Sequence, residues 1–413
     1  MFFEARRGVR GVVRALLSAR CLLTVLMLAG LSLFARDAHA FAWTIRHAYS
    51  RCTPCHVDPA GGGILTSYGR GMADEVINTR WGNESESEAD SRVSQFLFGA
   101  VELPEPLNLQ ADVRFLHLRQ KTEQVPLITR NILMQADFAA ALQLRGFTAS
   151  ASLGYAHEGA LSASLTSGET KNLVSRQHWL GYSLLDDKLM LRAGRYNLPF
   201  GLRSIEHTLW ARSQTRTNIN DQQQYGLGAV YQGDRLRAEL MVILGNFQLR
   251  PDRYRERGYS ATVEGYLTDK ITFGASSLVT HRKVDPLTLK ETYRHAHGVF
   301  SRIATPWEPL VLMAELDYVL ESPRFDRKRS GVVGYLQADL EPVQGIHIIG
   351  TGELQNVGNG QQPLSWAAWL SYAWFFAPHA DLRLDGIYQD LSVGSGLPRL
   401  QGVSFLLQGH VYL

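Results

Sequence analysis

A two-residue alternation of apolar and polar side chains runs from about residue 106 to the C-terminus and constrains the fold most strongly. In 132–138 the even-numbered residues are apolar, and the pattern continues to Leu144. It turns at Arg145-Gly146 and resumes over 147–155. Alternation of this kind predicts β-strands with one apolar and one polar face. Similar segments start near Leu107, Val174, Leu189, Gln224, Leu236, Tyr259, Ile271, Tyr293, Leu310, Val332, Val343, Leu364, Ala380 and Leu400.

The connections between these segments are expected to alternate in length. Tight turns are expected at Arg145-Gly146, Asp186-Asp187, Gln232-Gly233-Asp234, Thr268-Asp269 and Glu341-Pro342, and long connections at 118–130, 158–173, 197–222 and 246–257. About sixteen strands with short turns on one rim and long loops on the other are typical of a bacterial outer-membrane β-barrel. We therefore predict an all-β, antiparallel outer-membrane barrel preceded by a short N-terminal α-helical module.

A soluble all-β protein is the alternative, with its apolar strand faces packed inside. Sixteen strands are too many for a small filled barrel but suit a barrel with a polar lumen. The last strand fits the membrane barrel, since Val403, Phe405 and Leu407 share one phase while Ser404 and Gln408 share the other. The chain ends at Leu413 rather than at an aromatic residue.

The composition excludes several other classes of protein. Of the 413 residues 45% are hydrophobic and 20% charged, which argues against disorder. After the first forty residues no apolar run reaches about 18 residues, so a helical membrane domain is not expected. Without those forty residues, 36 basic and 37 acidic residues remain. This balance gives no support for a nucleic-acid partner, which usually requires a basic patch.

Residues 1–40 are predicted to be an export signal. Arg6, Arg7, Arg10, Arg14 and Arg20 form a basic region before the apolar stretch 21–34, and 38–40 has the small-x-small pattern of a cleavage site. An uncleaved signal anchor is the alternative. Cleavage would start the mature chain at Phe41 in an oxidising compartment.

The mature chain keeps two cysteines, Cys52 and Cys55, and they precede His56 in a Cys-x-x-Cys-His sequence. This spacing allows both thiols to form thioethers with one c-type haem while the histidine becomes the proximal iron ligand. A disulfide would not require the histidine, and a zinc site would require more ligands. We therefore expect one covalent haem c, held by Cys52, Cys55 and His56.

The distal iron ligand is left open between two residues. Met72 follows the turn-rich stretch 58–63, and His47 lies five residues before Cys52. A barrel side chain or an open position are further alternatives. A methionine ligand would raise the reduction potential relative to histidine.

The sequence predicts three parts after the signal. Residues 41–82 form the haem module, which is too short for an independent core and needs support from elsewhere. Residues 83–105 form an acidic linker and lead-in, and 106–413 form the barrel.

The connection 197–222 is expected to fold into the lumen and narrow it. Leu198, Phe200 and Leu202 would anchor it, and its arginines would attract small anions. A surface loop with solvated charges is the alternative. The predicted constriction residues are Arg195, Arg203, His207, Arg212 and Arg216.

In architecture, the signal, the single haem motif and the barrel resemble the fused monohaem cytochrome–porins of bacteria, a group that includes outer-membrane iron oxidases. The stretch 195–201 is similar to the start of the constriction loop in phosphate-selective-type porins. The stretches 56–63 and 68–70 resemble exported monohaem cytochromes. The resemblance implies electron transfer across the outer membrane, but it does not fix the electron donor.

Two functions follow as hypotheses. The first is electron transfer between an extracellular donor or acceptor, such as iron or another metal, and a periplasmic cytochrome. An enzyme of this kind would be a metal oxidoreductase. The second is a channel for small anionic solutes whose haem module acts as a plug or redox gate. The haem module is expected in the lumen or at its periplasmic side. The oligomeric state is left open.

Overall fold

In a computed structural model of the chain, the described residues are 43–47, 50–79, 95–123, 125–156, 165, 172–204, 206, 208–249, 252–358, 362–394 and 396–413. The predicted signal at 1–40 and the acidic part of the predicted linker lie outside them.

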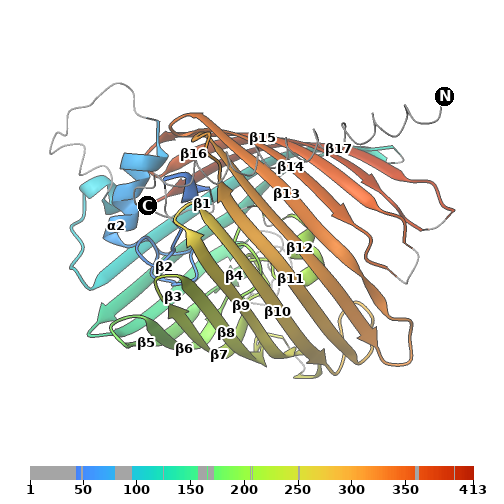
Figure 1. The fold of residues 1–413 in the computed structure, drawn as a ribbon, viewed down its shortest axis with the longest axis horizontal. Helices are drawn as coiled ribbons and strands as arrows, with labels where there is room; N and C mark the ends of the chain where they lie inside the picture. The colour runs from blue at the N-terminus through green and yellow to red at the C-terminus, as the bar shows by residue number, and fades with distance from the viewer. Residues whose placement is uncertain are drawn as a thin grey trace, which may run out of the picture.

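One antiparallel sheet closes on itself, because β1 pairs with β2 on one side and with β17 on the other (Figure 1). β4 and β5 pair with successive stretches of β3, so these two strands together occupy one position in the wall. The predicted barrel of sixteen strands is confirmed, with one extra short strand. The strands are β1 Leu107–Thr122, β2 Val125–Leu144, β3 Phe147–Ala156, β4 Asn172–Val174, β5 His178–Leu184, β6 Leu189–Tyr196, β7 Gln224–Gln232, β8 Leu236–Gly245, β9 Arg257–Thr268, β10 Ile271–Arg282, β11 Thr292–Ala304, β12 Leu310–Pro323, β13 Arg329–Val343, β14 Ile346–Gln355, β15 Ser365–Ala377, β16 Ala380–Leu391 and β17 Leu400–Tyr412.

The alternation in the sequence separates an apolar outer wall from a polar lumen. On β15, Trp366, Leu370 and Tyr372 point outward, while Trp369 and Ser371 are buried on the inner side. Large apolar residues are exposed in this phase on strand after strand, whereas charged residues fill the opposite phase. This is the face distribution of a barrel whose wall contacts lipid and whose interior is polar.

The two rims differ as predicted, with one correction. The turns at Arg145-Gly146, 185–188, 233–235 and 269–270 are short and share a rim with the start of β1 and the end of β17. The connections 197–223 and 246–256 are long and lie on the other rim. The expected long loop at 118–130 is wrong, because β1 and β2 continue as a hairpin with only 123–124 between them. Charged and polar side chains on both faces of this hairpin obscure the alternation.

Two strand boundaries also differ from the prediction. The turn expected at Glu341-Pro342 lies at Gln344-Gly345, since an irregularity in the ladder carries β13 on to Val343. Gly345 has φ +78°, which suits glycine at a tight turn. The strand expected from Val174 is broken after that residue and continues as β5 from His178.

The helical elements are short. They are η2 Thr44–His47, α2 Ser67–Met72, η3 Ala73–Ile77, η4 Phe96–Gly99, α4 Trp210–Thr215 and η6 Asp252–Tyr254. Only α2 is α-helical in the predicted haem module, so this module is less helical than expected. No helix in the described part of the chain is long and apolar enough to cross a membrane.

The N-terminal segment, defined as residues 43–47 and 50–79, lies in the mouth of the barrel at the short-turn rim. Its contacts include the short turns: Gln344 donates to the Asn78 carbonyl (3.0 Å), and Arg51 donates to that of Asp234 (2.9 Å). In Figure 1 this blue segment lies beside the C-terminus at one end of the barrel.

Candidate functional site

The Cys-x-x-Cys-His sequence forms one tight turn of backbone. The amides of Cys55 and His56 both donate to the Cys52 carbonyl, at 3.3 and 3.0 Å. The two thiols are free rather than joined in a disulfide. Gly61, at φ +85°, allows the chain to pass close to this turn, because a Cβ there would stand 3.0 Å from the Cys52 Sγ.

Helix α2 packs directly on the Cys-x-x-Cys-His turn. Thr66 caps its N-terminus by accepting a hydrogen bond from the Gly69 amide (3.0 Å). A Cβ at Gly69 would lie 2.2 Å from the Cys55 carbonyl oxygen, so only glycine permits this close approach. The contact places Met72, at the end of α2, across from His56.

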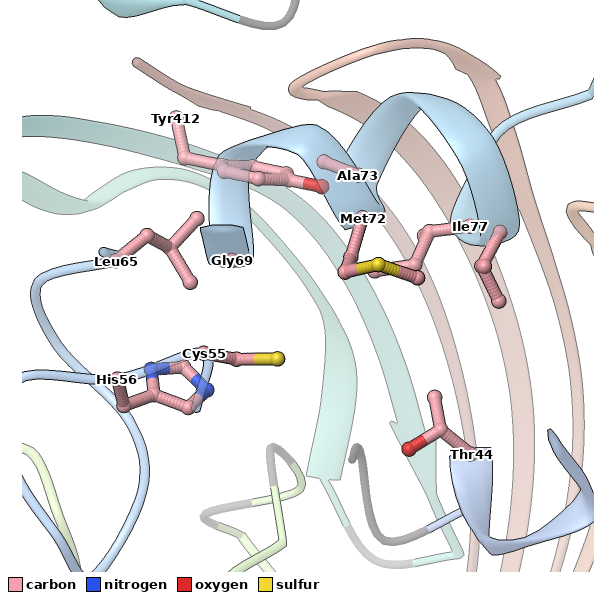
Figure 2. Close-up of a pocket in the computed structure, with 10 residues that line it drawn as sticks. Thr44, Cys55, His56, Leu65, Gly69, Met72, Ala73, Ile77 and Tyr412 are labelled. Atoms are coloured by element: carbon pink, nitrogen blue, oxygen red, sulfur yellow. The ribbon is translucent and has the colours of Figure 1, made fainter. Parts of the chain in front are cut away.

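A small cavity, partly open to solvent, lies between the turn and the helix. In Figure 2, His56 and the Cys55 sulfur lie on one side of it, and the Met72 sulfur lies on the other. The remaining lining residues are Thr44, Leu65, Gly69, Ala73, Val76, Ile77 and Tyr412. The lining is mainly apolar.

Burial keeps the reactive groups of this cavity neutral. It raises the pKa of the Cys55 thiol to about 12 and lowers the pKa of His56 to about 4. A protonated thiol is a poor nucleophile, which argues against a dithiol redox pair. A neutral imidazole has the free lone pair that a metal ligand requires.

The residues present fit a covalently bound haem c. Cys55, His56 and Met72 provide a thiol, an imidazole and a thioether around one apolar cavity, and Cys52 lies in the same turn as Cys55. His47 does not line this cavity; its Nε2 lies 3.5 Å from a carboxylate oxygen of Glu341 on the barrel wall. Of the two predicted distal ligands, Met72 therefore has the suitable position.

Ion pairs fasten the N-terminal segment to the barrel wall. Arg46 is paired with Asp339 at 2.5 Å and with Glu341 at 3.0 Å, and all three side chains are nearly inaccessible. Arg302 on β11 donates to the Ser50 carbonyl (3.0 Å). Buried charge-assisted bonds of this kind fix position and orientation.

A second fastening holds the Cys-x-x-Cys-His turn itself. Arg192 on β6 pairs with Asp58 at 2.8 Å and also with Glu239 on β8. Its guanidinium lies 4.2 Å from the ring centre of Tyr196 and 5.6 Å from that of Trp179. The side chains of Arg192, Asp58 and Glu239 are at most 3% exposed. Arg192 thus links the turn to the wall.

The long connection 197–223, here called the inward loop, folds into the lumen as predicted. Its anchors Leu198, Phe200 and Leu202 are buried. Arg203 donates to the Gly61 carbonyl at 3.0 Å, so the inward loop touches the N-terminal segment. Val57 and Ile64 pack in the same apolar cluster as Leu198 and Phe200. The inward loop and the N-terminal segment consequently pack against each other inside the lumen.

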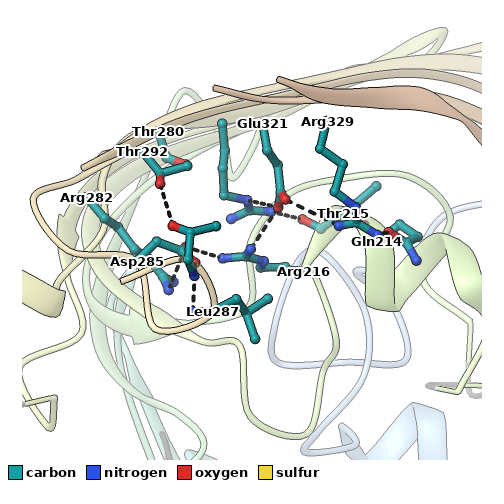
Figure 3. A network of polar contacts seen from close by, with 12 residues as sticks. Gln214, Thr215, Arg216, Thr280, Arg282, Asp285, Leu287, Thr292, Glu321 and Arg329 are labelled. Atoms are coloured by element: carbon teal, nitrogen blue, oxygen red, sulfur yellow. Dashed lines mark hydrogen bonds and ion pairs between the residues drawn. The ribbon is translucent and has the colours of Figure 1, made fainter. Parts of the chain in front are cut away.

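Arg216 ties the end of the inward loop to the opposite wall (Figure 3). It pairs with Asp285 at 2.6 Å and with Glu321 at 2.7 Å, and it adopts φ +51° after α4. Arg329 pairs with Glu321 (3.3 Å) and donates to Gln214 (2.9 Å). A left-handed backbone at a non-glycine residue is held by this surrounding network.

The other predicted constriction residues have different surroundings. Arg212 pairs with Glu315, and Arg195 is fully buried at the end of β6, where it donates to Gln223 (3.4 Å). His207 lies outside the described residues. Arg203 retains about 20% exposure of its side chain. Acidic partners neutralise Arg212 and Arg216, which weakens the expected attraction for anions.

A separate metal site is not evident in the described part of the chain, where no three His, Cys, Asp or Glu side chains are placed to hold an ion.

Solved structures with this architecture include outer-membrane proteins, among them a channel and a porin. OmpT of Vibrio cholerae superposes with a TM-score of 0.56 at 9% identity, covering 76% of this chain and 100% of that chain. The anion-selective porin of Comamonas acidovorans gives 0.56 at 11% identity, covering 74% and 99%. The channel DcaP of Acinetobacter baumannii gives 0.55 at 10% identity, covering 74% and 97%. The chain has a porin fold. No protein-family model and no curated protein matches the sequence.

The residues that dock the N-terminal segment in the porin lumen were not identified from the sequence. The inward phase of the strands was the sequence feature that could have identified them; it is shared by Arg192, Glu239, Asp339 and Glu341. Phase alone does not show which charge faces which partner across the lumen.

We predict that Arg192→Gln loosens the N-terminal segment. Loss of one partner of a buried ion pair costs about 3–5 kcal/mol, and the neighbouring Arg203 and Arg237 would offset part of this. Limited proteolysis of the folded protein should cut residues 43–79 faster, and planar bilayers should show a larger conductance.

Arg399→Gln is the matched control, since Arg399 pairs with Asp390 in a half-exposed position on the long-loop rim. Such pairs contribute about 0–1 kcal/mol. Cleavage and conductance at the wild-type level in Arg192→Gln would refute the docking role of Arg192.

Proposed function

We propose that this protein is an outer-membrane electron-transfer barrel that carries one haem c in its lumen. The observation that carries the proposal is the position of the Cys-x-x-Cys-His turn. It is fastened inside a porin-type barrel and faces Met72 across an apolar cavity. When bound there, haem c supplies one-electron transfer.

The chain's own residues have distinct roles in this proposal. Cys52 and Cys55 would attach the cofactor, and His56 and Met72 would provide the proximal and distal ligands to its iron. Arg192 and Asp58 orient the turn, and Tyr412 of the barrel wall lines one part of the cavity. The wall thereby supplies the packing that a segment of about 40 residues cannot provide alone.

The position of the cavity sets the direction in which each partner approaches. The short-turn rim of an outer-membrane barrel faces the periplasm. Tyr412, at the end of β17, lines the cavity, so a periplasmic cytochrome would approach from this side. An extracellular donor would enter from the long-loop mouth and meet the inward loop, which favours a small reductant such as a metal ion or its complex.

A solute channel with a haem-dependent gate is the second candidate. The porin fold supports it, and the bond from Arg203 to the Gly61 carbonyl provides a direct contact between the inward loop and the stretch 57–61, which follows the Cys-x-x-Cys-His turn. A redox-linked shift of that turn would then be passed to the loop that narrows the lumen.

Covalent haem is the first test of the proposal. Denaturing gels stained for haem peroxidase activity should show a band at the mature mass, because thioethers survive denaturation. Cys52→Ala combined with Cys55→Ala should abolish the stain while the heat-modifiable barrel persists. A stain retained by this double variant would overturn the haem assignment.

The distal ligand gives a second prediction. Met72→Ala should lower the midpoint potential and remove the absorption band of the methionine–iron bond, because methionine raises the potential relative to other ligands. His47→Ala should leave both properties unchanged, since His47 lies against Glu341. The reverse pattern would assign the distal position to His47.

The third test distinguishes electron transfer by the haem from passage of solutes through the barrel. Liposomes loaded with a soluble periplasmic cytochrome should show reduction of that cytochrome when a small reductant is added outside. The rate should fall by at least about tenfold in His56→Ala, which lacks the proximal ligand. Equal rates in both proteins would show that the barrel merely lets the reductant pass, and the channel proposal would then replace the electron-transfer proposal.

A further inference from the structure

Two neighbouring loops on the long-loop rim form one connected surface. Loop 283–291 joins β10 to β11, and loop 324–328 joins β12 to β13. Lys290 pairs with Asp326 (2.6 Å), and Arg324 pairs with Glu291 (2.8 Å). The Arg324 amide also donates to the Glu291 carbonyl (2.7 Å). These three bonds fix the loops relative to each other, and we call the result the rim patch.

The rim patch is cationic. It carries five exposed basic side chains, and its exposed or half-exposed acids are Glu291 and Asp326. Asp285 is fully buried and bound to Arg216, so it does not reduce the surface charge. Lys283, Arg327 and Lys328 form no salt bridge with any residue that the structure describes. The basic residues are Lys283, Lys290, Arg324, Arg327 and Lys328.

The same loops expose three large apolar side chains. Phe325 is 90% exposed, and Leu287 and Leu289 are 73% and 72% exposed. Single apolar residues on a surface require no explanation, but several of them beside free cations form an amphipathic patch that marks an interaction surface.

The outer wall below the rim patch changes character with depth. On β11 the outward residues descend from Tyr293 through His295 and His297 to Val299. The ladder places Tyr318 of β12 beside His297 and Leu316 beside Val299. Cations on the rim are thus followed by aromatic and imidazole side chains and then by aliphatic ones. Aromatic residues in such a band occupy the interface between headgroups and acyl chains.

Basic residues continue into the loop on one side of the rim patch but not into the loops on its other side. The next loops around it, 356–364 and 392–399, contain one basic residue, Arg399, and this residue is paired with Asp390. Loop 246–256, on the side of β9, contains Arg250, Arg253 and Arg255, of which Arg255 is paired with Asp252.

We propose that the rim patch and the wall beneath it bind a phosphorylated glycolipid of the outer leaflet. The free cations would contact its phosphates, the tyrosine and histidine side chains its sugars, and the aliphatic wall its acyl chains. The proposal rests on the outer-membrane placement proposed above, with the long loops outside the cell. It is independent of haem binding.

Binding can be measured on the delipidated full-length holoprotein in detergent, by native mass spectrometry with bisphosphorylated lipid A as the probe. The triple variant Lys283→Gln, Arg327→Gln, Lys328→Gln should bind lipid A roughly 100-fold more weakly, because it removes three cations that each attract the anionic headgroup. The matched control is Lys188→Gln, Arg235→Gln, Lys270→Gln, which removes three cations from the short-turn rim. It should bind as the wild type does.

A second variant tests the apolar part of the patch. Phe325→Ser with Leu287→Ser should weaken binding of lipid A, while excess inorganic phosphate should fail to displace the lipid from the wild type. Wild-type affinity in the triple variant, an equal loss in the control, or full displacement by phosphate would each overturn the proposal. Haem staining and liposome electron transfer report separately on the proposed function, so the two failures are distinguishable.

Discussion

The structure depends on the requirement that every backbone amide and carbonyl in a lipid environment finds a partner within the protein. The pairing of β1 with β17 meets this requirement, because it leaves the wall without an open edge. Closure of about sixteen strands then creates a lumen that is too wide to be filled by strand side chains alone. The inward phase is polar, so ion pairs with the wall hold what occupies the lumen, together with apolar clusters such as that of Val57, Ile64, Leu198 and Phe200. The N-terminal segment and the inward loop are both held in this way.

The main role of the buried ion pairs in the lumen is to fix the position of the segments that they join. Removing two charges from water is costly, and their attraction repays this cost only when the geometry is good. Arg46 reaches two carboxylates of the wall, and Arg192 reaches Asp58 on the segment and Glu239 on the wall. Such pairs specify one orientation of the Cys-x-x-Cys-His turn relative to the barrel. A short segment without a core of its own is thereby fixed in one orientation.

The same charge pairing alters the expectation for the pore. Arginines in the inward loop suggested an anion-attracting constriction, but Arg212 and Arg216 are paired with carboxylates across the lumen. Their charges serve to fix the loop. Among the described residues, the cations without a salt bridge include Lys283, Arg327 and Lys328, which lie outside the lumen on the rim patch. A charge count along the sequence is therefore a poor guide to the potential inside a barrel, because it does not show which charges are neutralised.

The sequence by itself determined the closed β-barrel, the phase of each face and most turns, and it predicted a haem-binding motif. These features follow from local patterns: a period of two residues, turn chemistry, and the spacing of Cys52, Cys55 and His56. It failed at 118–130, where polar residues on both faces of a hairpin obscure the period. Only the tertiary structure decided that Met72 rather than His47 faces His56, and that Arg192 forms an ion pair with Asp58. Both outcomes depend on contacts between residues far apart in the chain, and these are set by the closure of the barrel and the packing of its lumen.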